Sequence, residues 1–210
     1  MSGIETFIQR RSDKEPVSAT ILEGMAATDL LVVENEWRAE RSSVMQELLA
    51  AGVARPNWPE SLHWDWSRKV PELQLLASTG FGIVCEKRWQ GVMMTKSAGY
   101  FTRLDPDKGK PLLYVDYLEV APWNWVIPQI NRDGLYKTVG STLFWRAVQQ
   151  SEEEGFHGRI GLHALPQAEP FYEKVCRMTP IGRDASKQNL LYFELTRQQA
   201  VGFLKMGESK

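Results

Sequence analysis

The segment PLLYVDYLEVAP, at residues 111 to 122, limits the possible folds more than any other part of the chain. It is almost continuously apolar or aromatic, which is typical of a central strand that is covered on both faces. Two carboxylates, Asp116 and Glu119, interrupt this run. Because side chains alternate along a strand, Asp116 shares a face with Tyr114, and Glu119 lies on the opposite face. We therefore expect a sheet that is packed on both sides and carries one carboxylate on each face of this strand.

Apolar spacing predicts the elements that precede this strand. Residues 1–79 are expected to be helical, because apolar residues recur at helical spacing at 21–26 and again at 44–49. The second of these helices should end at Gly52, a common stop signal. A third, short helix is expected at about residues 62–70.

Residues 80–196 are expected to hold the sheet. The segments FGIVCEK and QGVMMTK read as two antiparallel strands before the central one, and GRIGLHAL and NLLYFELT read as strands after it. A helix is expected from about Thr138 to Glu154, ended by Gly155, and another in QAEPFYEKV. Helices followed by the order β-β-β-α-β-α-β predict one domain of the α/β class, of α+β type, over residues 1–210.

Composition excludes several classes of protein. The 210 residues carry 25 Lys and Arg against 26 Asp and Glu, a formal net charge of −1, whereas nucleic-acid-binding domains are usually strongly basic. Two cysteines are too few for a disulfide scaffold, and no Cys/His cluster has zinc spacing, so no metal is expected. No apolar run has the length of a membrane span or a signal peptide. We expect a soluble cytoplasmic protein without a nucleic-acid or membrane partner.

The segment GLYKTVGSTL, residues 134 to 143, has the composition of an anion-binding loop. It is not a Walker loop, because Val139 stands where G-x-x-x-x-G-K-[ST] needs its second glycine. The first N–H groups of the following helix, from about Val139 to Ser141, have no partners within the helix and lie at the positive end of its dipole. Gly140 allows close approach of a ligand, and Lys137 adds a positive charge.

Three short motifs follow one another in the chain: LEVAP at 118–122, VGSTL at 139–143 and PFYEK at 170–174. Together they resemble the GNAT superfamily of acyl-CoA-dependent N-acetyltransferases, and the resemblance extends over residues 80–196 in element order. It implies a single GNAT-like domain whose central sheet is mixed, mostly antiparallel and flanked by helices. It also implies acetyl-CoA as the acyl donor.

The resemblance further implies which residues contact acetyl-CoA. The pantetheine arm would pair with the backbone of Leu118 and Val120. The pyrophosphate would be held by the loop and the first turn of the helix: Lys137, Thr138, Val139, Gly140 and Ser141.

Acetyl transfer to a primary amine requires a neutral amine, an oriented thioester and a proton for the departing thiolate. The resemblance places Tyr172 near the sulfur as the proton donor, although a helical tyrosine can equally pack against a sheet. Asp116 and Glu119 are candidates for the base, because desolvation in an apolar strand should raise a carboxylate pKa. Pairing with Arg or Lys, or a water chain as the base, are the alternatives. His163, at a predicted strand end, either assists proton movement or serves a structural role.

The acceptor site is expected in the N-terminal part of the chain, where Trp64, Asp65 and Trp66 would form aromatic walls with one carboxylate. The alternative is that the tryptophans pack in the core. The resulting hypothesis is an N-acyltransferase that passes an acetyl group from acetyl-CoA directly to a primary amine of a small molecule or protein. Leu135 stands at the leading Arg or Gln of the GNAT loop motif, and Thr138 stands at its first glycine. These departures leave open the alternative that the protein is a non-catalytic member of the fold that binds acyl-CoA or another protein. A toxin-type acetyltransferase acting on aminoacyl-tRNA and a homodimer also stay open.

Overall fold

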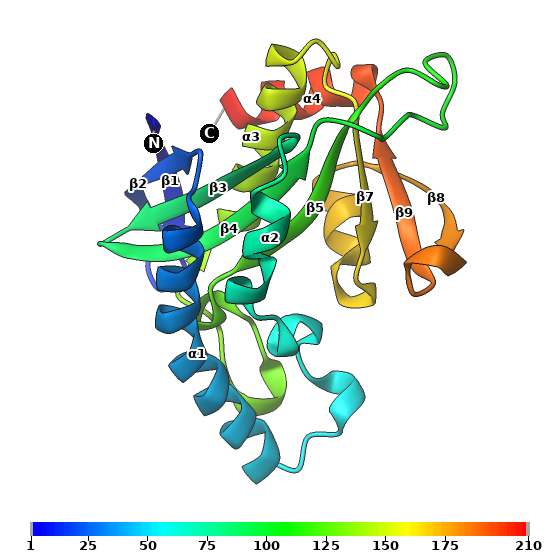
Figure 1. The fold of residues 1–210 in the computed structure, drawn as a ribbon. Helices are drawn as coiled ribbons and strands as arrows, with labels where there is room; N and C mark the ends of the chain where they lie inside the picture. The colour runs from blue at the N-terminus through cyan, green and yellow to red at the C-terminus, as the bar shows by residue number, and fades with distance from the viewer. Residues whose placement is uncertain (1, 209–210) are drawn as a thin grey trace. The chain divides into compact units, whose positions relative to one another are not determined.

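The computed structural model describes residues 2–208 and the side chains of residues 3–205 (Figure 1). The predicted domain also included residues 1, 209 and 210, which lie outside the described residues. Within the described part, the nine strands are β1 (Ser2–Arg10), β2 (Pro16–Glu23), β3 (Ser78–Cys85), β4 (Arg88–Lys96), β5 (Leu113–Val120), β6 (Tyr136–Lys137), β7 (Ile160–Ala164), β8 (Thr179–Asp184) and β9 (Leu190–Leu195). The α-helices are α1 (Ala27–Ala50), α2 (Val70–Leu73), α3 (Val139–Glu153) and α4 (Arg197–Glu208).

The strands form a sheet in the order β6-β1-β2-β3-β4-β5-β7-β9-β8. The sheet is mostly antiparallel, and β5 and β7 are a parallel pair. With the helices that flank it, this arrangement confirms the predicted α+β fold class. No helix in the described part of the chain is both long and apolar enough to span a bilayer.

The chain divides into two compact units. Unit 1 comprises the residues up to Met93 together with Leu118–Leu143, and unit 2 comprises Met94–Tyr117 together with the residues from Phe144 onward. Three elements, β4, β5 and α3, contribute residues to both units.

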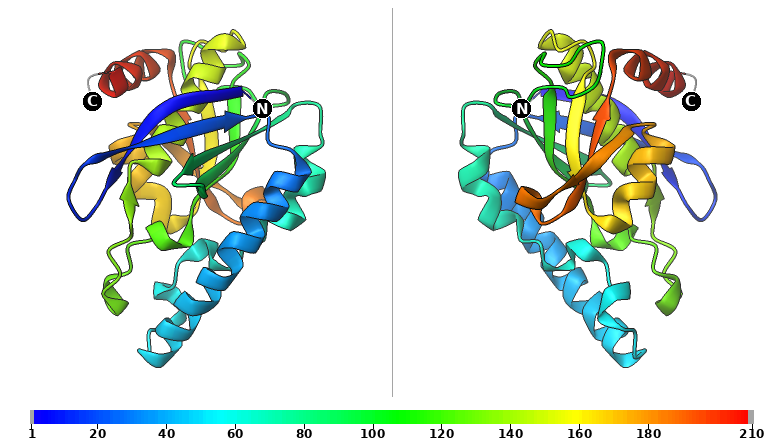
Figure 2. Two further views of the ribbon diagram at one scale, coloured as in Figure 1. Left: turned by 90° about the vertical axis from the view of Figure 1, so that its left-hand side faces the viewer. Right: turned by 90° about the vertical axis from the view of Figure 1, so that its right-hand side faces the viewer.

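Unit 1 begins with a β-hairpin, so the prediction of helix is wrong for residues 2–23. Strands β1 and β2 pair antiparallel from Ser2 with Glu23 to Gln9 with Pro16 (Figure 2). Ala19 and Ile21 are buried at alternate positions, which is the period of a strand, and β2 also pairs with β3. Pairing on both edges of β2 therefore overrides the helical spacing that this short apolar run suggests.

Helix α1 follows the hairpin and is a single long helix of 24 residues. Its start is stabilised by Asp29, whose carboxylate accepts the backbone N–H of Ala26 at 2.7 Å. The helix stops just before Gly52, as predicted, and Gly52 adopts a φ of +65°, which favours glycine. The buried face of α1 consists of Leu30, Val33, Glu34, Trp37, Arg41, Val44 and Leu48.

The short helix predicted at about 62–70 is present as tighter turns. Two 3₁₀ turns, Glu60–His63 and Trp66–Lys69, lead into the single α-helical turn of α2. Strands β3 and β4 form the predicted pair, and the turn between them is at Glu86 and Lys87, both with positive φ.

The segment between β5 and β6 packs against the C-terminal half of α1, and Figure 1 shows the two side by side. An ion pair joins Arg132 of this segment to Glu40 of α1. The segment is tied to β4 as well, because the indole N–H of Trp123 donates to the side-chain oxygen of Gln90 at 2.8 Å. A local core forms between these parts from Val44, Leu48, Trp58, Trp125 and Ile127.

Unit 2 contains β7, β8, β9 and α4. The predicted strands GRIGLHAL and NLLYFELT correspond to β7 and β9, which pair antiparallel. The helix predicted in QAEPFYEKV is a 3₁₀ turn, Pro166–Ala168, followed by a π-helical turn, Phe171–Val175. Strand β8 and helix α4 were not predicted.

Candidate functional site

The predicted anion-binding loop, residues 134 to 143, lies entirely in unit 1 and includes β6 and the first turn of α3. Thr138, which precedes α3, has a φ of +67°, in the left-handed region that favours glycine. This is the position at which the GNAT loop motif has its first glycine. The backbone therefore adopts a glycine-like conformation although a β-branched residue stands there, at a cost on the order of 1–3 kcal/mol.

The first turn of α3 is held against β4 by close packing. A Cβ at Gly91 would lie 2.7 Å from Cγ1 of Val139 and 3.0 Å from Cδ1 of Leu143, so no larger residue fits on the strand at this point. The carbonyl of Thr138 accepts the N–H of Thr142 at 2.8 Å, which closes the first helical turn. The N–H groups of the three residues between them have no partner one turn back in the helix. Unpartnered N–H groups at a helix start are able to bind an anion.

The other residues predicted to contact the acyl donor lie in the same unit. Lys137 is exposed, Thr138, Gly140 and Ser141 are half-buried, and Val139 is buried. The two β5 residues, Leu118 and Val120, are half-buried. Unit 1 thus brings together all seven predicted acyl-CoA contacts along one strand–loop–helix segment.

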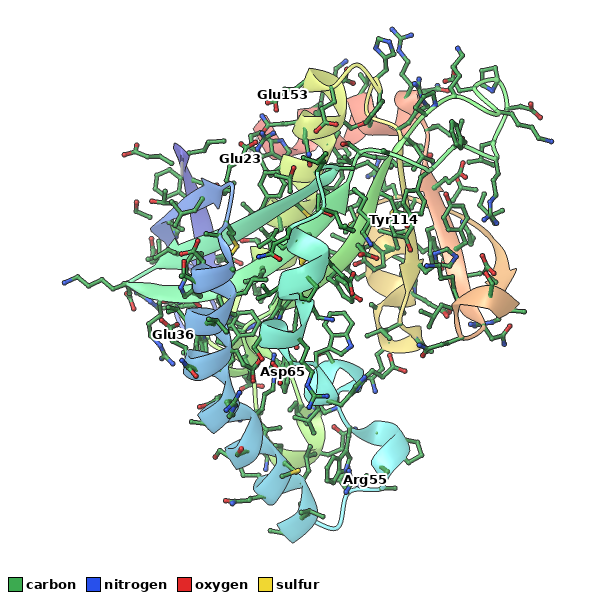
Figure 3. All side chains as sticks on the ribbon, in the orientation of Figure 1. Glu23, Glu36, Arg55, Asp65, Tyr114 and Glu153 are labelled. Atoms are coloured by element: carbon green, nitrogen blue, oxygen red, sulfur yellow. The ribbon has the colours of Figure 1, made fainter. Side chains whose placement is uncertain are left out.

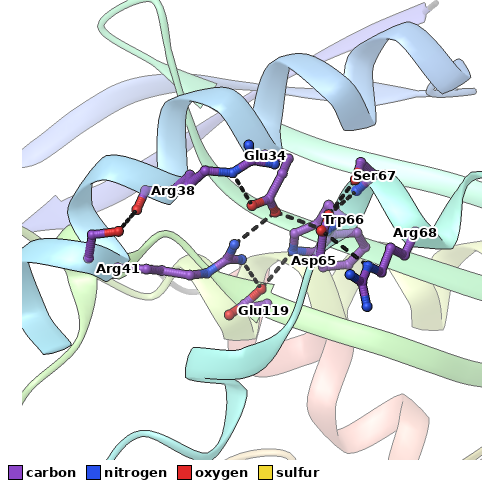
Figure 4. A network of polar contacts seen from close by, with 9 residues as sticks. Glu34, Arg38, Arg41, Asp65, Trp66, Ser67, Arg68 and Glu119 are labelled. Carbon is purple, nitrogen blue, oxygen red and sulfur yellow. Dashed lines mark hydrogen bonds and ion pairs between the residues drawn. The ribbon is translucent and has the colours of Figure 1, made fainter.

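Glu119 lies in a buried cluster of charges in unit 1, shown in Figure 4. Its Oε2 accepts a hydrogen bond from Nη2 of Arg41 at 3.0 Å and another from the indole N–H of Trp66 at 2.6 Å. Arg41 also donates through Nη1 to Oε2 of Glu34 at 2.8 Å. The backbone N–H of Trp66 donates to the same Glu34 oxygen at 3.0 Å. A single guanidinium therefore bridges two buried carboxylates, and Trp66 donates to both.

The electrostatics of this cluster agree with the prediction made for Glu119. Burial raises the pKa of its carboxyl, while Arg41, Trp66 and Ser61 favour the ionised form and offset only part of that effect. The pKa is therefore raised, as expected for a carboxylate in an apolar strand. The pairing with Arg41 is also the alternative that the sequence left open.

The predicted acceptor residues differ in their surroundings. Trp66 is fully buried and packs edge-on against Trp37, with ring centroids 6.4 Å apart. Trp64 is half-buried, and Nζ of Lys69 lies 4.7 Å from its ring centroid. Trp66 thus belongs to the core, which is the alternative to a place in the wall of the acceptor site.

Asp65 caps the turn that carries Trp66 (Figures 3 and 4). Its Oδ1 accepts the backbone N–H of Ser67 at 2.9 Å, and Arg68 lies 3.5 Å from Oδ2. Burial opposes ionisation of Asp65, but the hydrogen bonds from Ser67 and the charge of Arg68 outweigh it and lower the pKa. Asp65 is therefore an ionised capping residue at the edge of the buried cluster.

Asp116 and Tyr172 lie in unit 2. Asp116 pairs with Lys96, whose Nζ is 2.6 Å from Oδ2, so the structure places this carboxylate in an ion pair. Tyr172 is the second residue of the π-helical turn, and its ring packs against those of Phe144 and Phe193, with centroids 6.3 and 6.2 Å away.

The hydroxyl of Tyr172 is protonated at neutral pH, because burial raises its pKa well above the ordinary value. None of the described residues forms a hydrogen bond with this hydroxyl. Cys176, one turn further, is buried, and burial also raises the pKa of its thiol. A buried neutral thiol is a poor nucleophile, so Cys176 serves as a small core residue.

Three polar residues that form buried or half-buried contacts in the structure, Glu34, Arg41 and Asp184, were not predicted from the sequence. Glu34 and Arg41 are seven positions apart on α1, two helical turns, which places them on one face among apolar residues. Charged residues inside an apolar helical stripe were the available signal. Asp184 gave none, because its partner, His163, becomes a neighbour only through the pairing of β7, β9 and β8. No group of three or more His, Cys, Asp or Glu side chains suited to a metal occurs among residues 2–208.

Comparison with known proteins finds similarity in structure. No protein-family model matches the sequence, and no curated protein matches it significantly. An uncharacterised protein from Bacillus halodurans matches with a TM-score of 0.51 at 11% identity, over 99% of this chain and 97% of that chain. The GNAT domain of PAT from S. lividans matches with a TM-score of 0.49 at 11% identity, over 92% and 96%. PaiA N-acetyltransferase from Thermoplasma acidophilum, solved with coenzyme A, has a TM-score of 0.46 at 13% identity, over 83% and 97%.

At these identities the similarity concerns the fold. The match with the Bacillus halodurans protein extends over nearly the whole of both chains. The mostly antiparallel sheet and the passage from β5 through an irregular segment to α3 are the arrangement that the GNAT resemblance predicts. The chain thus has the α+β fold that the sequence predicts.

Proposed function

We propose that the protein is an N-acyltransferase that transfers an acetyl group from acetyl-CoA directly to a primary amine of a small molecule or protein. The observation that carries this proposal is the start of α3. There Thr138 holds a glycine-like φ of +67°, and the amides of the next three residues begin the helix without partners one turn back. This conformation is retained although the loop lacks the glycine of the motif.

The donor site would use unit 1 alone. The pyrophosphate would accept hydrogen bonds from the N–H groups of Val139, Gly140 and Ser141, at the positive end of the α3 dipole. Lys137, exposed beside them, would add a charge. The backbone of Leu118 and Val120 would pair with the pantetheine arm.

In the reaction, the C–N bond forms as the C–S bond breaks, the amine loses a proton, and the thiolate gains one. We assign the second proton to Tyr172, because burial keeps its phenol protonated and no described residue occupies its hydroxyl. Asp116 and Glu119 are the carboxylate candidates for the first. Each is paired, so a role as base requires release from Lys96 or from Arg41.

The amine would bind beside the turn that carries Trp64 and Asp65, which are half-buried. Trp66 would act from beneath, by fixing this turn to Glu34 and Glu119. An ionised Asp65 suits a cationic amine before it loses its proton.

Calorimetric titration with acetyl-CoA tests the donor site. Gly140→Glu places a carboxylate among the helix amides, and we expect binding to be lost, while an acidic residue in the first turn favours the helix itself. Gly202→Glu on α4 is the matched control, because a side chain there meets nothing within 4 Å. This control should bind as the wild type does. Absence of binding by the wild-type chain would overturn the proposal.

Turnover of Tyr172→Phe tests the proton donor. We expect kcat for thioester consumption, measured with a panel of primary amines, to fall by about 100-fold or more, because general acid catalysis contributes 10²–10⁴-fold. The affinity for acetyl-CoA should stay the same, since the ring remains packed. An unchanged kcat would remove Tyr172 from the reaction.

A second function, binding of acyl-CoA without transfer, is favoured by one observation: both carboxylates of β5 are paired. This reading requires acetyl-CoA binding that is lost in Gly140→Glu, together with no thioester consumption in the presence of any amine of the panel.

A further inference from the structure

A continuous hydrogen-bonded chain of three side chains crosses unit 2. The hydroxyl of Tyr114, on β5, lies 2.8 Å from Nδ1 of His163 on β7. Nε2 of the same imidazole lies 3.2 Å from Oδ2 of Asp184 at the end of β8. Three strands thus contribute one member each, and Figure 3 labels Tyr114.

The direction of these hydrogen bonds follows from Asp184. Its Oδ1 accepts both the backbone N–H of Ser186 at 2.9 Å and the Ser186 hydroxyl at 2.6 Å. The hydrogen bonds from Ser186, and to a smaller extent His163, hold the pKa of Asp184 below its ordinary value, so it is ionised and can only accept. Nε2 of His163 therefore carries the hydrogen, and Nδ1 accepts the hydroxyl of Tyr114.

The chain runs from the interior toward the surface. Tyr114 is 3% exposed, the side chain of His163 is 7% exposed, and that of Asp184 is 22% exposed. Burial lowers the pKa of His163 and raises that of Tyr114, so both are neutral at neutral pH. The charged member is the one nearest to water.

The surroundings of His163 hold the imidazole in place. Its ring lies 4.8 Å from that of Tyr192 on β9, and Gly161 makes room for that tyrosine, because a Cβ at Gly161 would overlap the Tyr192 hydroxyl oxygen. Tyr100 stacks on Tyr114 with the rings 3° from parallel. The charged groups that act on the imidazole are Asp184, which favours protonation, and Lys187 and Arg103, which oppose it.

We propose that Tyr114, His163 and Asp184 form a proton path in which His163 takes up a proton through the Tyr114 hydroxyl. In one passage, the ammonium form of an amine gives its proton to the Tyr114 oxygen and becomes neutral, while the proton of Tyr114 moves to Nδ1. The imidazole becomes an imidazolium, whose Nε2–H remains on the carboxylate of Asp184. Loss of the Nε2 proton to water at the Asp184 end makes the imidazole neutral again, with its hydrogen on Nδ1. Exchange of the ring protons with water, gain at Nε2 and loss from Nδ1, then restores the starting tautomer.

The path supplies a base that is not held in an ion pair. Asp116 and Glu119 on β5 are both in ion pairs, whereas His163 is a neutral base. Its use on the acceptor amine rests on the proposed acyl transfer. The existence of the path does not, since it can be measured in the free protein.

The first test is an NMR titration of the imidazoles in the ¹⁵N-labelled full chain, without substrate. We expect His163 to carry its hydrogen on Nε2 and to have a pKa below the ordinary value of about 6.5. Asp184→Asn should lower that pKa further, because it removes the charge that favours the imidazolium, and it should mix the two tautomers. The resonances of the exposed His63 and His157 are internal references, which should be the same in the wild type and in Asp184→Asn. A His163 pKa and tautomer that are insensitive to Asp184→Asn would overturn the path.

The second test uses the pH profile of thioester consumption with the amine panel. Tyr114→Phe keeps the ring but breaks the path, and we expect kcat to fall by about 100-fold with the KM for acetyl-CoA unchanged. Asp184→Asn should move the acidic limb of kcat/KM to lower pH, in step with the His163 pKa from NMR. An unmoved limb, or an undiminished kcat in Tyr114→Phe, would overturn the role of the path in transfer. If the wild type consumes no thioester, the proposed function fails while the NMR result still decides the path.

Discussion

The two ends of β5 carry polar networks of opposite kinds. Toward its end in unit 1, Glu119 shares Arg41 with Glu34, and all three are buried. Toward its start in unit 2, Tyr114 begins a chain of neutral groups that ends at a partly exposed, ionised Asp184. The first network consists of full charges away from water, and the second has its single full charge at the surface.

This difference separates a network that holds elements together from one that can pass a proton. Buried opposite charges depend on one another, because removal of one leaves the others without compensation. Neutral donors and acceptors in series can each exchange a proton without leaving a buried charge unpaired. The stability cost of breaking each network should therefore differ severalfold.

Removal of Arg41 should produce the largest effect. Arg41→Ala leaves two buried carboxylates without their guanidinium, and we expect the free energy of unfolding to fall by about 3–5 kcal/mol. Urea denaturation at neutral pH measures it. Arg38→Ala is the matched control on the same helix, because the Arg38 side chain is 61% exposed and that of Arg41 is 7% exposed. Exposed pairs contribute about 1 kcal/mol or less. Equal losses in the two variants would contradict the distinction.

Tyr114→Phe should produce a smaller loss of stability. The substitution removes one hydroxyl and leaves Nδ1 of His163 without its donor, while the stacking with Tyr100 is retained. We expect the free energy of unfolding to fall by about 1 kcal/mol, the usual contribution of one hydrogen bond. A loss as large as that of Arg41→Ala, in the same denaturation experiment, would mean that the unit 2 chain is structural in the way the Glu119 cluster is.

The smallest expected effect is a change in how the free energy of unfolding depends on pH. Because burial raises the pKa of Glu119, this residue contributes stability below its pKa in the unfolded chain, about 4.3, and that contribution is lost as the pH rises through the folded pKa. Glu119→Gln cannot ionise. The unfolding free energy of the variant minus that of the wild type should therefore increase above about pH 4.3. Glu153→Gln, at an exposed position of α3, controls for loss of a carboxylate. A difference that is flat or decreases with pH would show that Arg41 outweighs burial.

Much of the central part of the fold could be predicted from local patterns. Strand β5 is nearly continuously apolar, and α3 has a clear apolar stripe that ends at Gly155, whose φ is +76°. Such elements are specified by their own residues. The N-terminal hairpin was missed because β2 is short, and its identity depends on hydrogen bonds to β1 and β3. The π-helical turn around Tyr172 likewise has no signature in residue spacing.

For the candidate site, the sequence identified single residues and left their partners open. Asp116 and Glu119 stood out as carboxylates in an apolar strand, and each could be read as a base or as half of an ion pair. Arg41 is 78 positions from Glu119, and Asp184 is 21 positions from His163. No periodicity links residues at such separations.

The sequence by itself determined the central strand, the loop and helix that follow it, and the residues at which charge or a hydroxyl interrupts an apolar pattern, because these features depend on neighbours within a few positions. Only the tertiary structure decided that Thr138 takes the backbone conformation of a glycine, that Glu119 is held by Arg41 and Trp66, and that Tyr114 reaches Asp184 through His163. The physical reason is that hydrogen bonds and desolvation act over a few ångströms in space, whichever residues the folded chain brings there.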